Sequence, residues 1–256
     1  MTTSTNSGLL QSVASALDLL DCFAEHEELG VIEVSKQLGV AKSTAHRLLS
    51  TLVSRGLVEQ NSKNGKYRLG LHLYELGQLA VTRYDLRRGA RSLLEELREV
   101  TGWTVQLSVP SGVDTLVLER LQTLRSYKAL PEWQRRLPAS ITAQGKALCA
   151  FDPELARRRI QAGLPRATER SITDPAKFRQ ELEAIKRRGY ATATGEAVKD
   201  ISSVAAPVID SRGFAVAAIA INGPPSDIVP TEARLGKLIQ AAARRLSKEL
   251  RPQYSV

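Results

Sequence analysis

Residues 31–70 read VIEVSKQLGVAKSTAHRLLSTLVSRGLVEQNSKNGKYRLG. This stretch predicts a short helix that ends at Gly39, a second helix over 43–55, and two short strands at 57–60 and 66–69 that are joined by a turn. A three-residue turn after such a helix sets two helices at a steep angle, and a hairpin after the second helix forms a wing. The sequence therefore predicts a winged helix-turn-helix, and double-stranded DNA is the first partner to consider.

The second helix of this stretch is amphipathic. Its apolar residues recur at the spacing of one buried helix face: Ala45, Leu48, Leu49 and Leu52. Its start and its opposite face carry hydrogen-bond donors: Lys42, Ser43, Thr44, His46, Arg47 and Ser50. Taken alone, the pattern also fits an ordinary surface helix. The turn before it and the hairpin after it favour a helix that enters a major groove, where Arg47 and His46 would reach base edges.

Basic residues are concentrated in this stretch. The whole chain has a formal net charge of +9, yet residues 1–83 hold eight basic and eight acidic residues. Between 34 and 69, in contrast, seven basic residues meet a single acidic residue, Glu59. Phosphates are therefore expected near the helix start and the wing. The residues expected to hold them are Lys42, Ser43, Thr44, Lys66 and Arg68.

Length and composition predict two folded domains. The chain has 256 residues, of which 43% are hydrophobic, which is enough for two cores. The start lacks a basic and apolar leader, and no run approaches 18 apolar residues, so a cytoplasmic location is expected. The two cysteines, Cys22 and Cys149, have no CxxC or histidine neighbours. They predict buried thiols rather than a disulfide framework or a metal site.

The remaining chain predicts an α+β protein with an antiparallel sheet and helices on its faces. A first helix is expected from Ser12, as its N-cap, to His26. Strands are expected at 103–109, 115–121, 190–195, 202–209 and 214–222. Further helices are expected at 71–81, 85–101, 144–150, 153–162, 175–188 and 231–250. The expected domains are a winged helix-turn-helix over 1–70, a linker helix over 71–84, and a second domain over 85–256.

Several separated motifs resemble the IclR family of bacterial transcriptional regulators, and the resemblance covers nearly the whole chain. The motifs are LLQSVASALDLLDCFAEH, LGVAKSTAHRLLSTLVSRGLVEQ, KYRLG, TAQGKALCAF, RRGYATATGEAVKDISSVAAPVID and AVAAIAING. The resemblance implies a GAF-like effector domain and a homodimer or homotetramer that binds a pseudo-palindromic operator. It also implies a small organic ligand that alters operator affinity, most often in a repressor. An activator of a catabolic operon with the same architecture is the alternative.

The same resemblance implies an effector cup between the loop that starts at Thr142 and the last three strands. Carried over by motif, its contacts would be Ala143, Gln144, Gly145, Ala193, Ser203, Ala220 and Asn222. A loop that leads into a helix presents free backbone N–H groups, which suit a carboxylate. The alternative is a simple connection between a strand and a helix.

The cup departs from the pattern of family members that bind very small polar acids. Such members have an acidic residue where this chain has Ala193, a cysteine at Ser203, and serines at Ala220 and Asn222. Trp133 lies in a segment that lacks the usual glycine, and it could line the cup, pack internally or contact another subunit. These differences favour an effector larger and more apolar than glyoxylate or pyruvate, such as an aromatic acid.

Other classes of function find less support in the sequence. All three histidines lie before residue 73, so the second domain has none for general base catalysis. Ser202 or Ser203 could pair with Lys146, and Glu119, Glu196 and Asp200 offer carboxylates, but none shows a catalytic signature. Twelve aromatic residues and no stacking motif argue against an RNA-binding or architectural protein. No enzyme activity, cofactor or metal is therefore expected.

Overall fold

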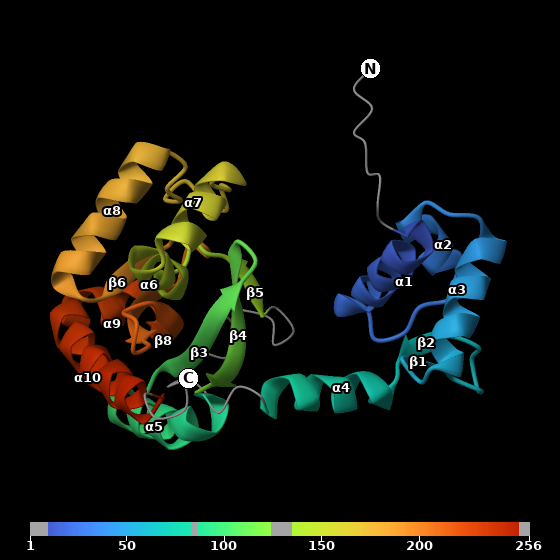
Figure 1. Ribbon diagram of the computed structural model, residues 1–256, viewed down its shortest axis with the longest axis horizontal. Coiled ribbons are helices and arrows are strands. Elements are labelled where there is room, and N and C mark those ends of the chain that lie inside the picture. Colours follow the sequence, from blue (N-terminus) through green and yellow to red (C-terminus); the bar gives the residue numbers. More distant parts are fainter. Residues whose placement is uncertain (1–9, 83–85, 124–134, 251–256) are drawn as a thin grey trace. The chain divides into compact units, whose positions relative to one another are not determined.

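The chain forms two compact units, Met1–Tyr84 and Asp85–Val256. The structure is a computed structural model, and it describes residues 10–82, 86–123 and 135–250 (Figure 1). Each unit has its own apolar core, and the larger unit has one core on each face of its sheet.

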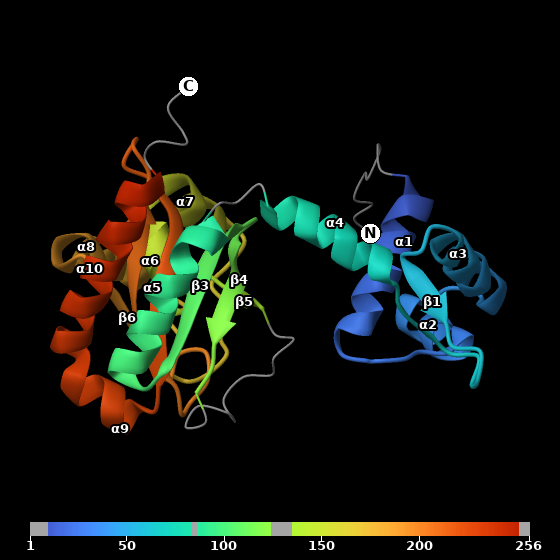
Figure 2. The ribbon, with the colours of Figure 1, turned by 90° about the horizontal axis from the view of Figure 1, so that it is seen from below.

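The first unit packs three helices and a two-stranded sheet around one core. Its elements are α1 (Gln11–Asp21), the 3-10 turn η1 (Cys22–Ala24), α2 (Val31–Leu38), α3 (Lys42–Ser54), β1 (Val58–Gln60), β2 (Tyr67–Leu69) and α4 (Leu71–Thr82). Leu19, Val34 and Leu49 are fully buried where α1, α2 and α3 meet. Leu29 adds a short antiparallel bridge to Tyr67 of β2. The result is the predicted winged helix-turn-helix, which Figure 2 shows from below.

Two predictions for the first helix were wrong. Leu10, not Ser12, is the N-cap of α1, and no side chain caps this end. The helix also ends at Asp21 and continues only as η1, well before His26. Only Leu19 is fully buried within α1, whereas Val13 and Leu17 are more than half exposed, so the apolar spacing of this helix did not predict its buried face.

The second unit contains a six-stranded antiparallel sheet in the order β5-β4-β3-β8-β7-β6. The strands are β3 (Thr104–Ser111), β4 (Asp114–Leu121), β5 (Arg136–Pro138), β6 (Ala191–Thr194), β7 (Ser202–Ile209) and β8 (Ala215–Gly223). The helices are α5 (Leu86–Thr101), α6 (Ala143–Phe151), α7 (Pro153–Gln161), α8 (Pro175–Arg188), α9 (Pro225–Ile228) and α10 (Glu232–Leu250), with a 3-10 turn η3 (Val229–Thr231) before α10.

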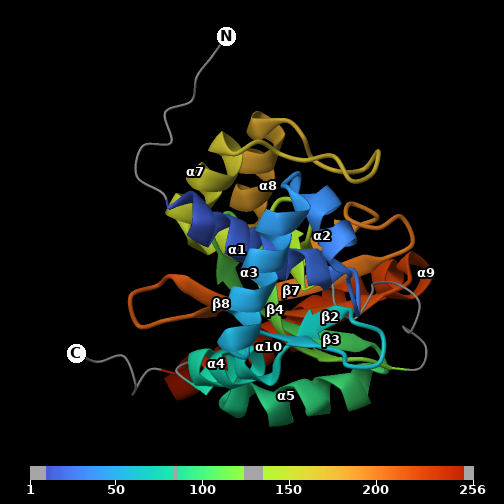
Figure 3. The same ribbon diagram turned by 90° about the vertical axis from the view of Figure 1, so that its right-hand side faces the viewer.

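Helices cover both faces of this sheet, as predicted. The helices α5 and α10 pack on one face, against residues such as Leu107 and Ile219. On the opposite face α6 lies against β7 and β8, and α7 and α8 pack outside it. Figure 3 shows the sheet between these two groups of helices. The α+β class is confirmed. The face of the sheet that α6 covers is a second candidate location for a functional site, after the helix-turn-helix.

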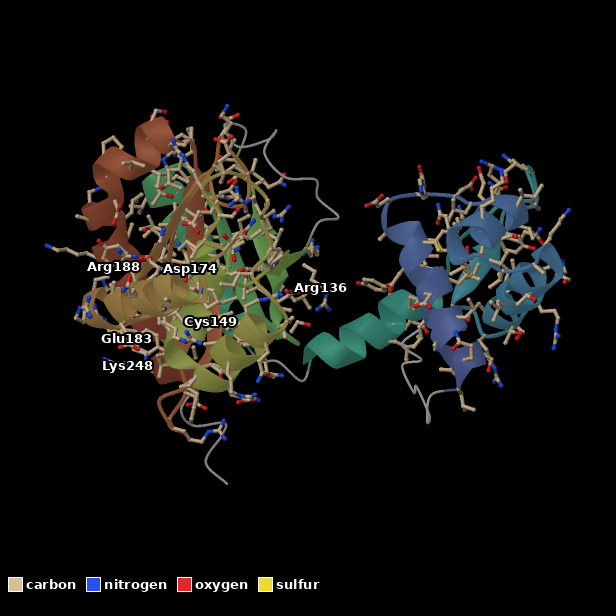
Figure 4. All side chains as sticks on the ribbon, turned by 90° about the horizontal axis from the view of Figure 1, so that it is seen from above. Arg136, Cys149, Asp174, Glu183, Arg188 and Lys248 are labelled. Atoms are coloured by element: carbon tan, nitrogen blue, oxygen red, sulfur yellow. The ribbon has the colours of Figure 1, made fainter. Side chains whose placement is uncertain are left out.

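The two cysteines differ in exposure. Cys149 on α6 is buried, and burial raises the pKa of its thiol to about 12 (Figure 4). Cys22 is only half-buried, so the expectation that both are buried holds for Cys149 alone. Within the described residues, no helix is long and apolar enough to span a bilayer, and no cluster of side chains has the composition of a metal site.

Candidate nucleic-acid interface and effector cleft

The helix-turn-helix is held by a left-handed glycine and a serine. Gly39 ends α2 with φ +64°, a conformation that favours glycine, and its N–H donates to the Lys36 carbonyl. The Ser35 hydroxyl donates to the Val40 carbonyl over 2.7 Å and closes the turn. These contacts fix the angle at which α3 leaves α2.

One face of α3 is buried and the other is free. Ala45, Leu49 and Leu52 pack into the core. The predicted DNA-contacting residues on α3 are all exposed: Lys42, Ser43, Thr44, His46, Arg47 and Ser50. In the part of the chain that the structure describes, neither Lys42 nor Arg47 takes part in an ion pair. The helix therefore presents a row of exposed hydrogen-bond donors.

The wing is tied to the first unit by one carboxylate that sequence reasoning missed. Glu28 accepts hydrogen bonds from the side-chain amides of Asn61 over 2.8 Å and Asn64 over 2.7 Å. These two donors, mainly, hold the pKa of Glu28 below its usual value. Gly65 closes the loop with φ +71° and an N–H bond to the Asn61 carbonyl. The wing loop is thus fixed before any DNA arrives.

The two wing cations predicted to hold phosphates already have acidic neighbours. Lys66 lies 3.9 Å from Glu33, and Arg68 lies 3.2 Å from Glu59. All four side chains are more than a third exposed, so these pairs are weak and can open. A phosphate would compete for both cations on the same surface.

The second candidate site is a small cleft at the start of α6, partly open to solvent, whose cavity volume is about 20 Å³. Six of its lining residues are polar: Gln106, Thr142, Gln144, Glu196, Ser203 and Asn222. The other six are apolar: Leu137, Ile141, Ala193, Ala197, Val198 and Ile201. An amphiphilic small molecule fits this mixture better than a purely apolar one.

The structure places the predicted effector residues unequally. Gln144, Ala193, Ser203 and Asn222 line the cleft. Ala143, Gly145 and Ala220 are buried beside it and do not line it. Gly145 packs directly on Ala139, where a Cβ atom would overlap the backbone. Trp133 lies outside the described residues.

Sequence reasoning missed Gln106 and gave Glu196 a different role, as a carboxylate for an enzyme. Gln106 lies on β3 between Val105 and Leu107, whose side chains enter the opposite core. The signal was the alternation in TVQLS, where polar residues occupy every second position. That alternation predicts a polar face, but only the sheet shows that the face is buried under α6.

A set of hydrogen bonds orders the cleft. Gln144 Nε2 donates to Gln106 Oε1 over 3.3 Å, and the Ser203 hydroxyl donates to Asn222 Oδ1 over 2.7 Å. Thr142 is the N-cap of α6 and accepts from the Gly145 N–H over 3.1 Å. The backbone N–H groups of Ala143 and Gln144 lie in the first turn of α6, so no carbonyl within the helix accepts from them. They are therefore available at the N-terminal end of the helix.

A buried ion pair lies next to the cleft. Lys146 is 1% exposed, and its Nζ donates to Glu196 Oε1 over 2.6 Å. Glu181 lies 3.8 Å from the same ammonium and pairs with Arg188, which Figure 4 labels, over 3.0 Å. Burial raises the pKa of Glu196, and the attraction of Lys146 opposes that shift.

The ion pair between Lys146 and Glu196 also tests whether a serine and Lys146 could form a catalytic pair. A Ser-Lys device needs a serine hydroxyl at the lysine amine. The Ser203 hydroxyl donates to Asn222 instead, and the Ser202 hydroxyl pairs with Thr194 over 2.8 Å. The ammonium of Lys146 is directed to carboxylates. Neither serine is therefore activated by Lys146.

Family models and similar proteins all indicate a transcriptional regulator of the IclR family. The family model "IclR helix-turn-helix domain" matches residues 12–62, and "Bacterial transcriptional regulator IclR C-terminal" matches residues 78–248. The transcriptional regulator BhcR of Paracoccus denitrificans is 34% identical over 97% of this chain and 90% of its own length. The regulator XynR of Escherichia coli is 33% identical over 94% of this chain and 98% of its own.

A solved structure of an IclR homologue from Microbacterium hydrocarbonoxydans, complexed with 4-hydroxybenzoate, has the same fold. It is 27% identical, covers 94% of this chain and 100% of its own, and superposes with a TM-score of 0.82. The two family models together cover most of the chain, one on each unit. This chain belongs to the IclR family of transcriptional regulators.

Proposed function

We propose that this regulator is a repressor that binds a pseudo-palindromic operator as a homodimer or homotetramer and responds to a small organic acid, an aromatic acid being favoured. The helix-turn-helix domain implies DNA binding. The observation that carries the proposal is the exposed, unpaired donor face of α3 in one unit together with a solvent-open cleft of mixed polarity in the other.

On the operator, α3 enters the major groove. Arg47 and His46 reach base edges, because they lie beyond the first turn on the exposed face. Phosphate contacts come from the helix start and the wing, and they position the helix without reading sequence. The residues in this second role are Lys42, Ser43, Thr44, Lys66 and Arg68, and Ser50 lies further along the same exposed face.

In the cleft, the carboxylate of the effector lies at the start of α6. The first-turn N–H groups of Ala143 and Gln144 and the side-chain amide of Asn222 supply donors there. Apolar residues such as Leu137 and Ile201 then cover the body of the ligand. The relative complexed with 4-hydroxybenzoate supports an acid of this size.

Effector binding lowers operator affinity by favouring an arrangement of the helix-turn-helix units that does not fit the operator, acting through residues 71–101. The acid can shift this equilibrium only by the difference between its affinities for the two arrangements. Small-angle scattering with and without the acid tests this step, and unchanged scattering with released DNA would contradict it.

A mobility-shift titration tests the function as a whole. Duplexes selected from a random pool by the full-length protein should be retained at low salt and released by an aromatic acid. Retained DNA that no acid releases would contradict the effector role but leave the DNA-binding role. Retention that increases with acid would favour activation over repression.

A further inference from the structure

In the part of the chain that the structure describes, six buried side-chain polar atoms have no partner. Among the described residues, the buried side-chain atoms without a partner are Thr104 Oγ1, Ser108 Oγ, Ser140 Oγ, Gln144 Oε1, Glu196 Oε2 and Asn222 Nδ2. A buried polar atom without a partner is costly, so such atoms are rare in folded proteins unless water or a ligand meets them.

Strand register places Thr104, Ser108 and Asn222 on the α6 side of the sheet. Thr104 pairs with Asn222, and Asn222 pairs with Ser203 in the next strand. Directly opposed residues in an antiparallel ladder project from the same face. The residues between them, such as Val105 and Ile221, enter the core with α5 and α10. A polar row therefore crosses β3, β8 and β7 beneath the start of α6.

Three of the unpaired atoms belong to residues that line the cleft: Gln144 Oε1, Glu196 Oε2 and Asn222 Nδ2. Reversing an amide would exchange donor and acceptor at Gln144 or Asn222. The Glu196 carboxylate, in contrast, accepts at both oxygens. It is 9% exposed, and its Oε1 is already taken by Lys146. Its Oε2 is thus a fixed acceptor that a bound molecule can satisfy.

The neighbouring charge decides what kind of donor fits. Lys146 at 2.6 Å already neutralises Glu196. An ammonium group on the ligand would bring a second positive charge to the same carboxylate, next to the first. A hydroxyl group brings a donor hydrogen without a charge, and a hydrogen bond to a carboxylate is stronger than one between neutral groups.

We infer that the effector is a hydroxylated carboxylic acid whose hydroxyl group donates to Glu196 Oε2. This inference rests on the proposed effector role of the cleft and narrows its ligand class. The carboxylate meets the donors at the start of α6, and the hydroxyl group meets the acceptor beside the buried ion pair.

Calorimetry on the full-length protein tests the inference with matched acids. The probes are 4-hydroxybenzoate, benzoate and 4-methoxybenzoate, together with 4-hydroxybutyrate and butyrate. In at least one series the hydroxylated acid should bind about tenfold or more tightly than its unsubstituted partner. The methoxy compound keeps the oxygen but loses the donor hydrogen, so it should bind no better than benzoate.

Two variants test whether Glu196 causes the preference for the hydroxylated acid. Glu196→Gln should reduce the preference for the hydroxylated acid to near one, because the retained oxygen still serves Lys146 while the other atom becomes a donor. Glu181→Gln is the matched control: it removes a carboxylate 3.8 Å from Lys146 but outside the cleft lining, and should leave the preference unchanged. If Glu196→Gln does not fold, the comparison of 4-hydroxybenzoate with 4-methoxybenzoate decides on the unaltered protein.

Equal or tighter binding of the acids that lack a hydroxyl group would overturn the inference, and so would an unchanged preference in folded Glu196→Gln. If neither 4-hydroxybenzoate nor 4-hydroxybutyrate binds at millimolar concentration while operator binding is intact, the inference is also overturned. The DNA-binding function would then remain in place. Failure to retain any duplex would instead overturn the proposed function.

Discussion

The two candidate sites use polar side chains in opposite ways. On α3 the polar residues are exposed and lie at helical spacing, so a short piece of sequence shows the whole face. In the cleft they are buried or half-buried and come from α6, β3, β7, β8 and the β6–β7 connection. The exposed face of α3 is suited to a rigid polyanion such as duplex DNA. The cleft contains buried polar atoms without a partner, which a small ligand would meet under our proposal.

This contrast predicts that the core residues of α3 affect stability more than any residue of its outer face. Leu49→Ala removes a fully buried side chain and should lower the free energy of unfolding by about 2–5 kcal/mol. Val53→Ala on the same helix removes a 37% exposed side chain and should cost much less. Denaturant unfolding measures both, and equal losses would contradict the assignment of the buried face.

Close packing at the start of α6 should make Gly145 intolerant of any side chain. A Cβ atom there would overlap the Ala139 backbone, so Gly145→Ala should cost about 1–3 kcal/mol of unfolding free energy. The matched control is Gly77→Ala in α4, where a Cβ atom meets nothing within 4 Å. That change should stabilise the protein by up to about 1 kcal/mol, because alanine is the better helix former. Thermal unfolding of both variants checks the opposite signs.

The wing should contribute affinity but not sequence choice. Lys66→Ala should weaken binding to all duplexes alike and reduce the salt dependence of log K by about one unit. Lys237→Ala removes the same charge from the exposed surface of α10 and should change neither quantity. Fluorescence anisotropy over a salt series measures the slopes. A loss confined to one sequence would show that Lys66 reads bases.

The smallest expected effect concerns the bond between Glu28 and the wing loop. The pKa of Glu28 is lowered in the folded state, so its contribution is present above the unfolded pKa and is lost as pH falls through the folded pKa. Amide exchange of residues 61–65, measured by NMR, should therefore quicken with acid relative to the rest of the first unit. Glu28→Gln should abolish that dependence, and its persistence would assign it to another group.

The sequence predicted most helices and strands to within a few residues, because their apolar periodicity is local. It missed β5 and α9, which have three and four residues and show no period. It also misplaced the start of α1, where no side-chain cap exists. Short elements of this kind form because the rest of the sheet provides partners, as β4 does for β5.

The same distinction applies to the sites. The exposed face of α3 follows from spacing within one helix, so all its predicted residues lie where they were expected. The cleft depends on contacts between distant residues, such as the hydrogen bond from Gln144 to Gln106 and the ion pair of Lys146 with Glu196. No local pattern joins positions 106, 144 and 196, and only the packing of α6 and of the β6–β7 connection on the sheet brings them together.

We propose that the exposed face of α3 lies against a duplex and that its side chains contact the bases. Selection from a random duplex pool at low salt tests this directly, with the unaltered protein, Arg47→Ala and Arg158→Ala. Arg158 is an exposed arginine on α7 and controls for charge alone.

We expect a pseudo-palindromic consensus for the unaltered protein and for Arg158→Ala. Arg47→Ala should lose the preference at one base position in each half-site, at a cost of about 1–3 kcal/mol per contact. No enrichment by the unaltered protein, or the same consensus from Arg47→Ala, would contradict the claim.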